Sequence, residues 1–155
     1  MEKILSDLKA MRLPGMARTW QNLMEAHKID SISMADGMRM LIQGENDMRM
    51  SNRTHRLIKN AHFRYTVALG EIATDSARGI DQSLLNEVAT CDYIRHGYPI
   101  IITGPTGTGK SWLASALGHH ACLCGYKVRY YNVMKLFEEL TMALSLIHIS
   151  EPTRR

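Results

Sequence analysis

Eight consecutive residues have the types and spacing needed to bind phosphate. Residues 104–111 read Gly-Pro-Thr-Gly-Thr-Gly-Lys-Ser, which fits the pattern G-x-x-x-x-G-K-S. Glycines let the backbone curl until successive N–H groups point at phosphate oxygens. Lys110 can reach the β- and γ-phosphates of a nucleotide, and the Ser111 hydroxyl can be a ligand of Mg²⁺. The predicted site consists of Gly104, Pro105, Thr106, Gly107, Thr108, Gly109, Lys110 and Ser111.

Such a loop must leave a strand and enter a helix, so that the helix N-terminus also faces the anion. The apolar, β-branched residues 99–103 predict a buried parallel strand before the loop, and residues 127–132 predict a second strand. After the loop, apolar residues recur at helical spacing over residues 112–117. This context favours a phosphate-binding loop over an ordinary glycine turn.

Acidic residues that could complete a hydrolytic site are scarce after the loop. A P-loop ATPase needs a carboxylate at the end of another core strand to hold Mg²⁺. Glu138 and Glu139 lie in residues 133–140, whose apolar spacing predicts a helix, and Glu151 lies in a short polar end. We therefore expect the chain to cradle a nucleotide without hydrolysing it, and no catalytic residue is assigned.

The first part of the chain predicts short amphipathic helices. Pro14 and Gly15 should end the first helix and precede the second. Ser33 with Asp36 can cap a third helix, which Gly37 and Gly44 should weaken. The apolar faces of the three helices contain Ile4, Leu5, Leu8 and Met11, then Met16, Trp20, Leu23 and Met24, then Met38, Leu41 and Ile42.

Basic side chains follow at a spacing that places them on one helical face. Arg49, Arg53, Arg56 and Lys59 are spaced i, i+4, i+7 and i+10, and no acidic residue occurs from Met48 to Gly70. This basic stripe, with Arg64 beyond it, could follow the phosphates of DNA. A solvated helix face explains the stripe equally well. Phe63 and Tyr65 could stack on bases, although their spacing favours packing.

Cysteine and histidine usage gives little support for a metal site. Cys91, Cys122 and Cys124 cannot all pair, which suits a reducing compartment. His120 and Cys124 lie one helical turn apart, yet two ligands do not make a site, and an ordinary helix end is favoured over a metal. The sequence has neither a signal segment nor an apolar run approaching 18 residues. We therefore expect a soluble, cytoplasmic protein without a membrane partner.

Several segments together resemble the IstB family, the ATP-binding helpers of insertion-sequence transposition. They are Met-Arg-Leu-Pro-Gly-Met at 11–16, the basic stretch 49–64, the helix start Gly-Ile-Asp at 79–81, in which Asp81 can cap the helix, Ile-Thr followed by the phosphate loop at 102–111, Ala-Leu-Gly-His at 116–119 and Gly-Tyr-Lys-Val at 125–128. The resemblance implies an AAA+ ATPase related to DnaC-type helicase loaders. It also implies ATP and Mg²⁺ at Gly104–Ser111, DNA contact by the basic stretch, homo-oligomers on DNA and a partner transposase. The acidic magnesium motif, sensor residue and arginine finger of the family have no counterpart here.

The expected fold is therefore α/β. A helical N-terminal domain over residues 1–70 precedes the first part of a P-loop, AAA+ parallel-sheet domain over 71–143, and 144–155 resemble a non-native, adapter-derived tail. Tyr93 and Ile94, just before the expected strand, are weak candidates for the base pocket. The expected function is an ATP-binding helper that binds DNA and activates a transposase. The alternatives are a DnaC-like helicase loader and a non-hydrolysing nucleotide- or DNA-binding fragment.

Overall fold

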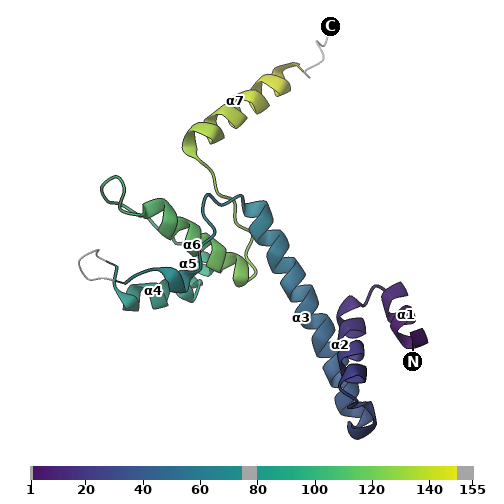
Figure 1. Ribbon diagram of the computed structural model, residues 1–155. Coiled ribbons are helices and arrows are strands. Elements are labelled where there is room, and N and C mark those ends of the chain that lie inside the picture. Colours follow the sequence, from purple (N-terminus) through teal and green to yellow (C-terminus); the bar gives the residue numbers. More distant parts are fainter. Residues whose placement is uncertain (1, 75–79, 150–155) are drawn as a thin grey trace. The chain divides into compact units, whose positions relative to one another are not determined.

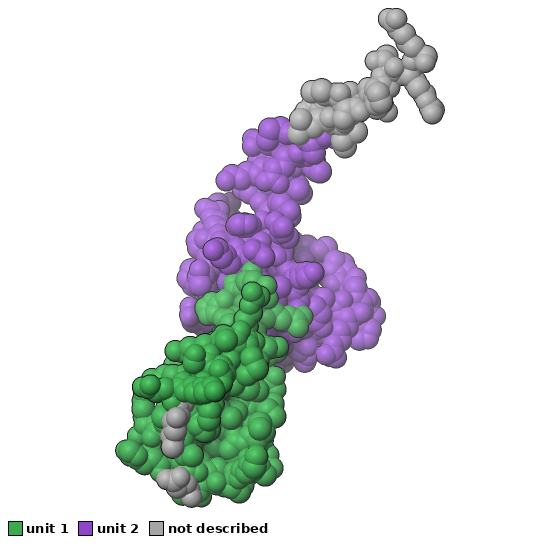
Figure 2. Space-filling view, turned by 90° about the vertical axis from the view of Figure 1, so that its right-hand side faces the viewer, with its two compact units in different colours: residues 1–56 green, residues 57–155 purple. Residues whose placement is uncertain are grey.

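The computed structural model describes residues 2–74 and 80–149 of the chain. The chain divides into two compact units, unit 1 over Met1–Arg56 and unit 2 over Leu57–Arg155 (Figure 2). The predicted domains 1–70, 71–143 and 144–155 stay predictions. The described residues contain no helix long and apolar enough to cross a membrane.

Unit 1 is built from helices, as the amphipathic patterns predict. Pro14 occupies the first turn of the second helix, where its missing N–H costs no hydrogen bond. Leu8 of the first helix and Ala17 and Leu23 of the second helix are buried. The elements are α1 (Glu2–Ala10), α2 (Pro14–Glu25), the short η1 (Ile29–Ser31) and the beginning of the long α3 (Met34–Ala61). Figure 1 labels α1, α2 and α3.

The predicted cap of α3 is confirmed. The Ser33 hydroxyl lies 3.1 Å from the backbone nitrogen of Asp36, which donates to it, and donates in turn to the Asp36 carboxylate at 2.7 Å. The expected weakening at Gly37 and Gly44 does not interrupt the helix, which is continuous from Met34 to Ala61. Gly44 lies against Thr19, and the backbone of Gly15 meets Gly44 and Glu45, so glycine serves here to let two helices approach closely.

Unit 2 contains the remaining helices. Asp81 caps α4, as predicted for the Gly79-Ile80-Asp81 helix start, and its side chain accepts hydrogen bonds from the Ser83 hydroxyl at 2.6 Å and the Ser83 backbone at 3.4 Å. Gly79 itself lies outside the described residues. The α6 helix contacts both η2 and α4. The elements are η2 (Leu69–Glu71), α4 (Gln82–Ala89), α5 (Asp92–His96), α6 (Lys110–Leu123) and α7 (Val133–Ile149).

The predicted α/β fold with a parallel sheet is wrong for residues 2–74 and 80–149, which form helices and no strand. A strand is stabilised by ladder hydrogen bonds to a neighbour about 4.8 Å away. Residues 99–103 have no such neighbour, and Ile101 is 82% exposed. In residues 127–132, the Tyr130 backbone N–H donates to the carbonyl of Ala61, the last residue of α3, at 2.9 Å. Both segments are β-branched or aromatic runs without a strand to pair with.

The last helix agrees with its apolar spacing. Residues 133–140 are helical, as predicted, and α7 continues to Ile149. Phe137 and Leu140 on this helix are exposed. The part of the suspected non-native tail from 150 to 155 lies outside the described residues, as do residues 75–79.

Candidate functional site

The phosphate loop runs directly into the N-terminus of α6. Gly104, Gly107 and Gly109 have φ values of +151°, +86° and +88°, which L side chains rarely adopt. Gly109 caps α6, and its carbonyl accepts the Leu113 backbone N–H at 2.9 Å. The glycines of the motif are therefore required by the backbone itself, and the loop–helix half of the predicted strand–loop–helix arrangement is present.

Lys110 folds back over this loop. Its ammonium donates to the carbonyl oxygens of Gly104, at 2.8 Å, and Pro105, at 2.5 Å. The Thr108 hydroxyl donates to the same Pro105 carbonyl at 2.9 Å. Neutral carbonyls thus hold the lysine at the loop, and its positive charge is not compensated by a carboxylate among the described residues.

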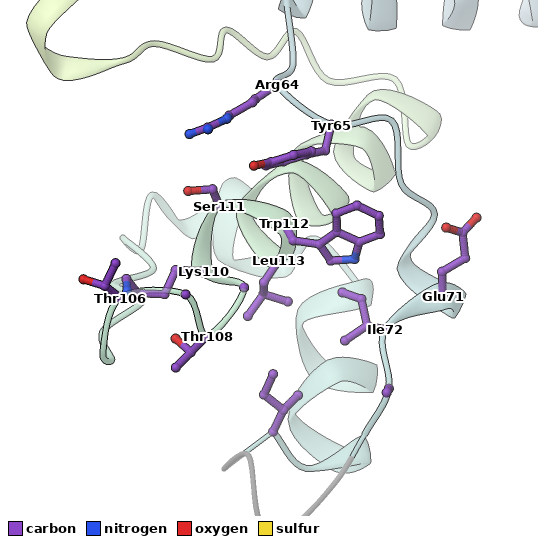
Figure 3. Close-up of a pocket in the computed structure, with 14 residues that line it drawn as sticks. Arg64, Tyr65, Glu71, Ile72, Thr106, Thr108, Lys110, Ser111, Trp112 and Leu113 are labelled. Atoms are coloured by element: carbon purple, nitrogen blue, oxygen red, sulfur yellow. The ribbon is translucent and has the colours of Figure 1, made fainter.

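A cavity of about 680 Å³ adjoins the loop. Figure 3 shows Lys110 and Thr106 on one side of it, with Ser111 and Trp112 following along α6. Ser111 is exposed, so its hydroxyl is accessible from the cavity. The lining consists of Arg64, Tyr65, Glu71, Ile72, Ala73, Ile80 and the residues from Thr106 to Leu113.

An aromatic pair forms another wall of the cavity. The ring centroids of Tyr65 and Trp112 lie 5.5 Å apart, with the ring planes tilted by 50° (Figure 3). The Arg64 guanidinium carbon lies 5.3 Å from the Tyr65 centroid, within cation–π range. Flat apolar rings beside a phosphate loop offer a surface for a nucleobase. Tyr93 and Ile94, suggested from the sequence for this role, do not line the cavity.

The charges lining the cavity favour an anion. Arg64 and Lys110 are positive, whereas Glu71 is the single acidic side chain among the lining residues that the structure describes. The N-terminal end of a helix adds a partial positive charge, equivalent to roughly half an elementary charge. The sequence pattern identified Lys110, but it missed Arg64 as part of this cavity because Arg64 lies 46 positions earlier in the chain.

Tight packing fixes the position of α6. Ala116 and Ser115 are fully buried, and the Ser115 hydroxyl donates to the Ser111 carbonyl at 2.8 Å. Phe63 lies so close to Gly118 that an added Cβ would stand 2.5 Å from its ring. Phe63 is therefore a packing residue, as its spacing favours, and a side chain at position 118 would push α6 away.

The structure separates Arg49 from the rest of the basic stripe. Arg49 Nε donates to the carboxylate of buried Glu45 at 2.7 Å. Arg53 and Arg56 are exposed and have no hydrogen bond or ion pair within the described part of unit 1. Lys59 and Arg64, in unit 2, are exposed as well. Arg49 thus already has a structural partner, whereas the other basic side chains face solvent.

Unit 2 has a second basic cavity, of about 630 Å³, that the sequence patterns did not identify. Arg64, Arg129 and Lys135 line it together with His62, Tyr130 and Tyr131. Arg129 and Lys135 come from separate segments with no shared periodicity, so only the fold brings them to Arg64. Glu139 also lines this cavity, whereas neither Glu138 nor Glu139 lines the cavity at the phosphate loop.

Comparisons with known proteins find the same family that the order of the sequence motifs suggests. The profile of the family described as IstB-like ATP binding protein matches residues 6–146. A protein of Pseudomonas fluorescens, named as an ATP-binding protein of insertion sequence IS1162, is 36% identical over 140 residues, covering 90% of this chain and 61% of that protein. The insertion-sequence ATP-binding protein y4pL of Sinorhizobium fredii is 32% identical, covering 90% of this chain and 57% of its own length.

A relative of lower sequence identity has a name of the same kind. The protein of Geobacillus stearothermophilus named for ATP binding and insertion sequence IS5376 is 25% identical over 142 residues, with 92% of this chain and 57% of that protein covered. The chain therefore spans a little under two thirds of the length of these relatives.

Proposed function

The chain belongs to the family of IstB-like ATP-binding proteins, and from this premise we propose that it binds ATP with Mg²⁺ at Gly104–Ser111 as part of a helper protein of insertion-sequence transposition. The observation that carries the proposal is the Lys110 ammonium beside a glycine loop at the start of α6, where loop carbonyls hold it and no carboxylate of the described residues pairs with it. An incoming phosphate can take over this ammonium from the loop carbonyls. The names of the relatives, which join ATP binding to insertion sequences, support the same function.

Each part of the nucleotide has a candidate partner in the cavity. The triphosphate would accept hydrogen bonds from the loop backbone and from Lys110, with the Ser111 hydroxyl as a Mg²⁺ ligand. The base would lie against the Tyr65 and Trp112 rings, and Arg64 is near enough to add a second positive charge. ATP hydrolysis is not part of the proposal.

Trp112 provides a direct test of nucleotide binding, because it lines the cavity. In a Trp20→Phe background, ATP with Mg²⁺ should change the Trp112 fluorescence with a saturable dependence on concentration. Lys110→Ala should weaken this binding by roughly tenfold or more, since charge-assisted hydrogen bonds contribute about 1.5–3 kcal/mol each. Lys127→Ala is the matched control, because Lys127 is exposed and lines neither cavity. Equal affinity of the two variants would contradict the proposal.

We propose further that the exposed basic side chains contact DNA, and that ATP promotes homo-oligomers on DNA that engage a partner transposase. Support for DNA contact comes from Arg53, Arg56 and Lys59, which are exposed on α3, and from Arg64, which lines both cavities. Several weak contacts on neighbouring subunits would add through effective concentration. The transposase partner is supported by the insertion-sequence names of the relatives alone.

Arg53 and Arg49 form a matched pair for testing DNA contact. Arg53→Ala should weaken binding to unrelated duplexes alike and should reduce the slope of log affinity against log salt by about one. Arg49→Ala should change DNA affinity less, because Arg49 already pairs with Glu45. Binding measured by fluorescence anisotropy over a salt series would decide. Unchanged affinity and slope in Arg53→Ala would remove Arg53 from the proposed interface.

A further inference from the structure

Three side chains with metal-binding atoms meet at the C-terminal end of α6, away from the phosphate loop. They are Cys91, His120 and Cys124, and their ligand atoms all lie within 4.8 Å of one another. His120 Nε2 lies 3.7 Å from Cys124 Sγ. The sequence pattern offered His120 and Cys124 as neighbours on one helical face, and the fold adds Cys91 from 29 positions before His120.

The backbone around this cluster holds the three residues in place. Cys91 joins α4 to α5 in a left-handed conformation, with φ +59°, and its backbone N–H donates to the Val88 carbonyl at 3.1 Å. His120 Nε2 lies 2.9 Å from the carbonyl oxygen of Ala89, to which it can only donate, so a metal bound through Nε2 would have to replace this hydrogen bond. Cys124 caps the end of α6 through backbone bonds to the carbonyls of His120 and Cys122. The side chains therefore come from elements that already pack together.

The separations suit a tetrahedral zinc ion. With Zn–S bonds of about 2.3 Å and Zn–N bonds of about 2.0 Å, a tetrahedral site separates a sulfur from a nitrogen ligand by about 3.6 Å and two sulfurs by about 3.8 Å. The His120–Cys124 separation of 3.7 Å already matches the first value. The remaining separations need a movement of about 1 Å or less, because none exceeds 4.8 Å.

We propose that Cys91, His120 and Cys124 form a binding site for one Zn²⁺ ion. Two thiolates and an imidazole are the ligands that zinc prefers over magnesium or calcium. The C-terminal end of α6 also carries a partial negative charge that favours a cation. Cys91 is buried and Cys124 is exposed, so the fourth position faces solvent on the Cys124 side and is filled by water.

Polar side chains near the Cys91, His120 and Cys124 cluster have other partners. The proposed zinc site therefore consists of these three residues. The Asp92 carboxylate is paired with Arg95 at 3.4 Å, and the Tyr126 hydroxyl accepts a hydrogen bond from Arg95 at 3.3 Å. Cys122 is fully buried in the core on another face of α6 and does not belong to the cluster. A bound ion would link the α4–α5 turn to the end of α6, and would bring together segments that are now joined by the His120–Ala89 hydrogen bond.

Cobalt provides an optical test, because Co²⁺ takes the same ligands as Zn²⁺ and its thiolate complexes absorb strongly in the near ultraviolet. The full 155-residue chain, prepared with a phosphine reductant and stripped of metal, would be titrated with Co²⁺ and then with Zn²⁺. We expect one Co²⁺ per chain, thiolate charge-transfer absorption, visible bands of tetrahedral intensity, and loss of all of these on addition of one equivalent of Zn²⁺.

Cys124→Ser is the informative variant, because Cys124 is exposed and its replacement leaves the core intact. It should bind Zn²⁺ at least tenfold more weakly, in competition with a chromophoric chelator. Cys122→Ala is the matched control, which removes a cysteine from the same helix without touching the cluster, and circular dichroism would verify the helix content of both. Absence of thiolate absorption in the wild-type chain would overturn the proposal. Equal zinc affinity of wild type and Cys124→Ser, or a Cys91–Cys124 disulfide that forms despite saturating Zn²⁺, would overturn it as well.

Discussion

The helices α2 and α6 both begin at glycine-containing turns, but their N-termini are treated in opposite ways. At α2, in unit 1, the residue before the helix is Leu13, which cannot cap it. The Glu45 carboxylate of α3 takes that role, accepting the backbone N–H groups of Gly15 at 2.8 Å and Met16 at 3.2 Å. At α6, in unit 2, the helix N-terminus adjoins a cavity, and no carboxylate of the described residues pairs with Lys110 there, although Glu71 lines the cavity.

The difference separates a structural anion site at α2 from the nucleotide site that we propose at α6. Both helix ends present N–H groups and a partial positive charge. Where the chain supplies its own anion, the charge contributes to the stability of unit 1. At α6 the charged side chain of loop residues 104–111 is Lys110, which is held by carbonyls, and no carboxylate of the residues that the structure describes pairs with it. Glycine therefore permits a close helix–helix approach at Gly15 and a positive φ at Gly107 and Gly109.

Gly15 offers the largest expected effect on this comparison. An added Cβ would stand 2.5 Å from the Glu45 Cα and nearer still to the Gly44 carbonyl oxygen, and backbone atoms cannot rotate away. Gly15→Val should destabilise unit 1 by about 3 kcal/mol, at the upper end of overpacking costs. Urea unfolding followed by Trp20 fluorescence in a Trp112→Phe background would measure it. A loss below about 0.5 kcal/mol, the usual range for surface changes, would contradict the close approach of α2 and α3.

ATP should stabilise the open end of α6 in the way that Glu45 stabilises the closed end of α2. At a free ATP concentration of 100 times Kd, unit 2 should gain about 2.7 kcal/mol against unfolding. Trp112 fluorescence during urea unfolding, with and without ATP and Mg²⁺, would measure the gain. Lys110→Ala, if it binds ATP tenfold more weakly, should lose about half of this gain at the same ATP concentration, and more if binding is weaker still. The Trp20 transition of unit 1 serves as an internal control. Equal stabilisation of Lys110→Ala and wild type would break the comparison.

Glu45→Ala should cost about 2 kcal/mol, because it leaves the buried N–H groups of α2 without an acceptor. Glu45→Gln is the matched control, since its side-chain oxygen can still accept one of these hydrogen bonds. The glutamine variant should lose about half as much. Trp20-monitored unfolding of the two variants would test the order. If the alanine variant were as stable as the glutamine variant, the carboxylate would not be the cap of α2.

The acid stability of unit 1 should depend on the same carboxylate. Burial alone raises the pKa of Glu45, but hydrogen bonds from Arg49 and from the Met16 and Gly15 backbones outweigh it and hold the pKa below its ordinary value of 4.5. Because the folded pKa is the lower one, the stabilisation is complete above about pH 5 and is lost as the pH falls through the folded pKa. The Trp20-monitored unfolding free energy should therefore decrease more steeply below pH 4.5 in wild type than in Glu45→Gln. Parallel pH profiles would contradict the assignment.

Gly37→Ala should give the smallest change in the unfolding free energy of unit 1, and it should raise this free energy rather than lower it. Gly37 lies in α3 with nothing within 4 Å of an added Cβ. Alanine should stabilise the helix by about 0.5–1 kcal/mol, since glycine in a helix interior carries an entropic cost. Together with Gly15→Val, this variant distinguishes a glycine that close packing requires from a glycine that the structure does not require. Destabilisation by Gly37→Ala, measured through Trp20, would show an unrecognised contact.

Sequence patterns predicted the features that depend on residues close together in the chain. The Ser33–Asp36 cap, the Asp81 cap and the helix over 133–140 agree with the structure because each depends on residues within one or two turns. Pro14 and Gly15, expected to precede the second helix, are instead its first two residues. The glycines at 104, 107 and 109 belong to the same class, since they adopt conformations that glycine favours, whereas phosphate binding by this loop stays a prediction.

Features that depend on contacts between residues far apart in the sequence could not be predicted from such patterns. Residues 99–103 have the composition of a strand, but a strand forms only where a partner aligns, and the described residues supply none. Glu45 has no sequence signal as the cap of α2, from which it is separated by 30 positions. Cys91 and Arg64 likewise join their clusters only through the fold. Which basic residues are available for DNA also depends on Glu45, because it engages Arg49 and leaves Arg53 and Arg56 exposed.

The uninterrupted helix α6 connects the phosphate loop to the cysteine–histidine cluster. It runs over 14 residues, which places its ends about 20 Å apart. If occupation of one end changes the free energy of the other by any amount, thermodynamic reciprocity requires the return effect to be equal. A zinc ion that raised the affinity for ATP threefold would itself bind three times more tightly to the ATP-loaded chain. Titrating zinc and then ATP, or ATP and then zinc, would therefore give the same total binding free energy.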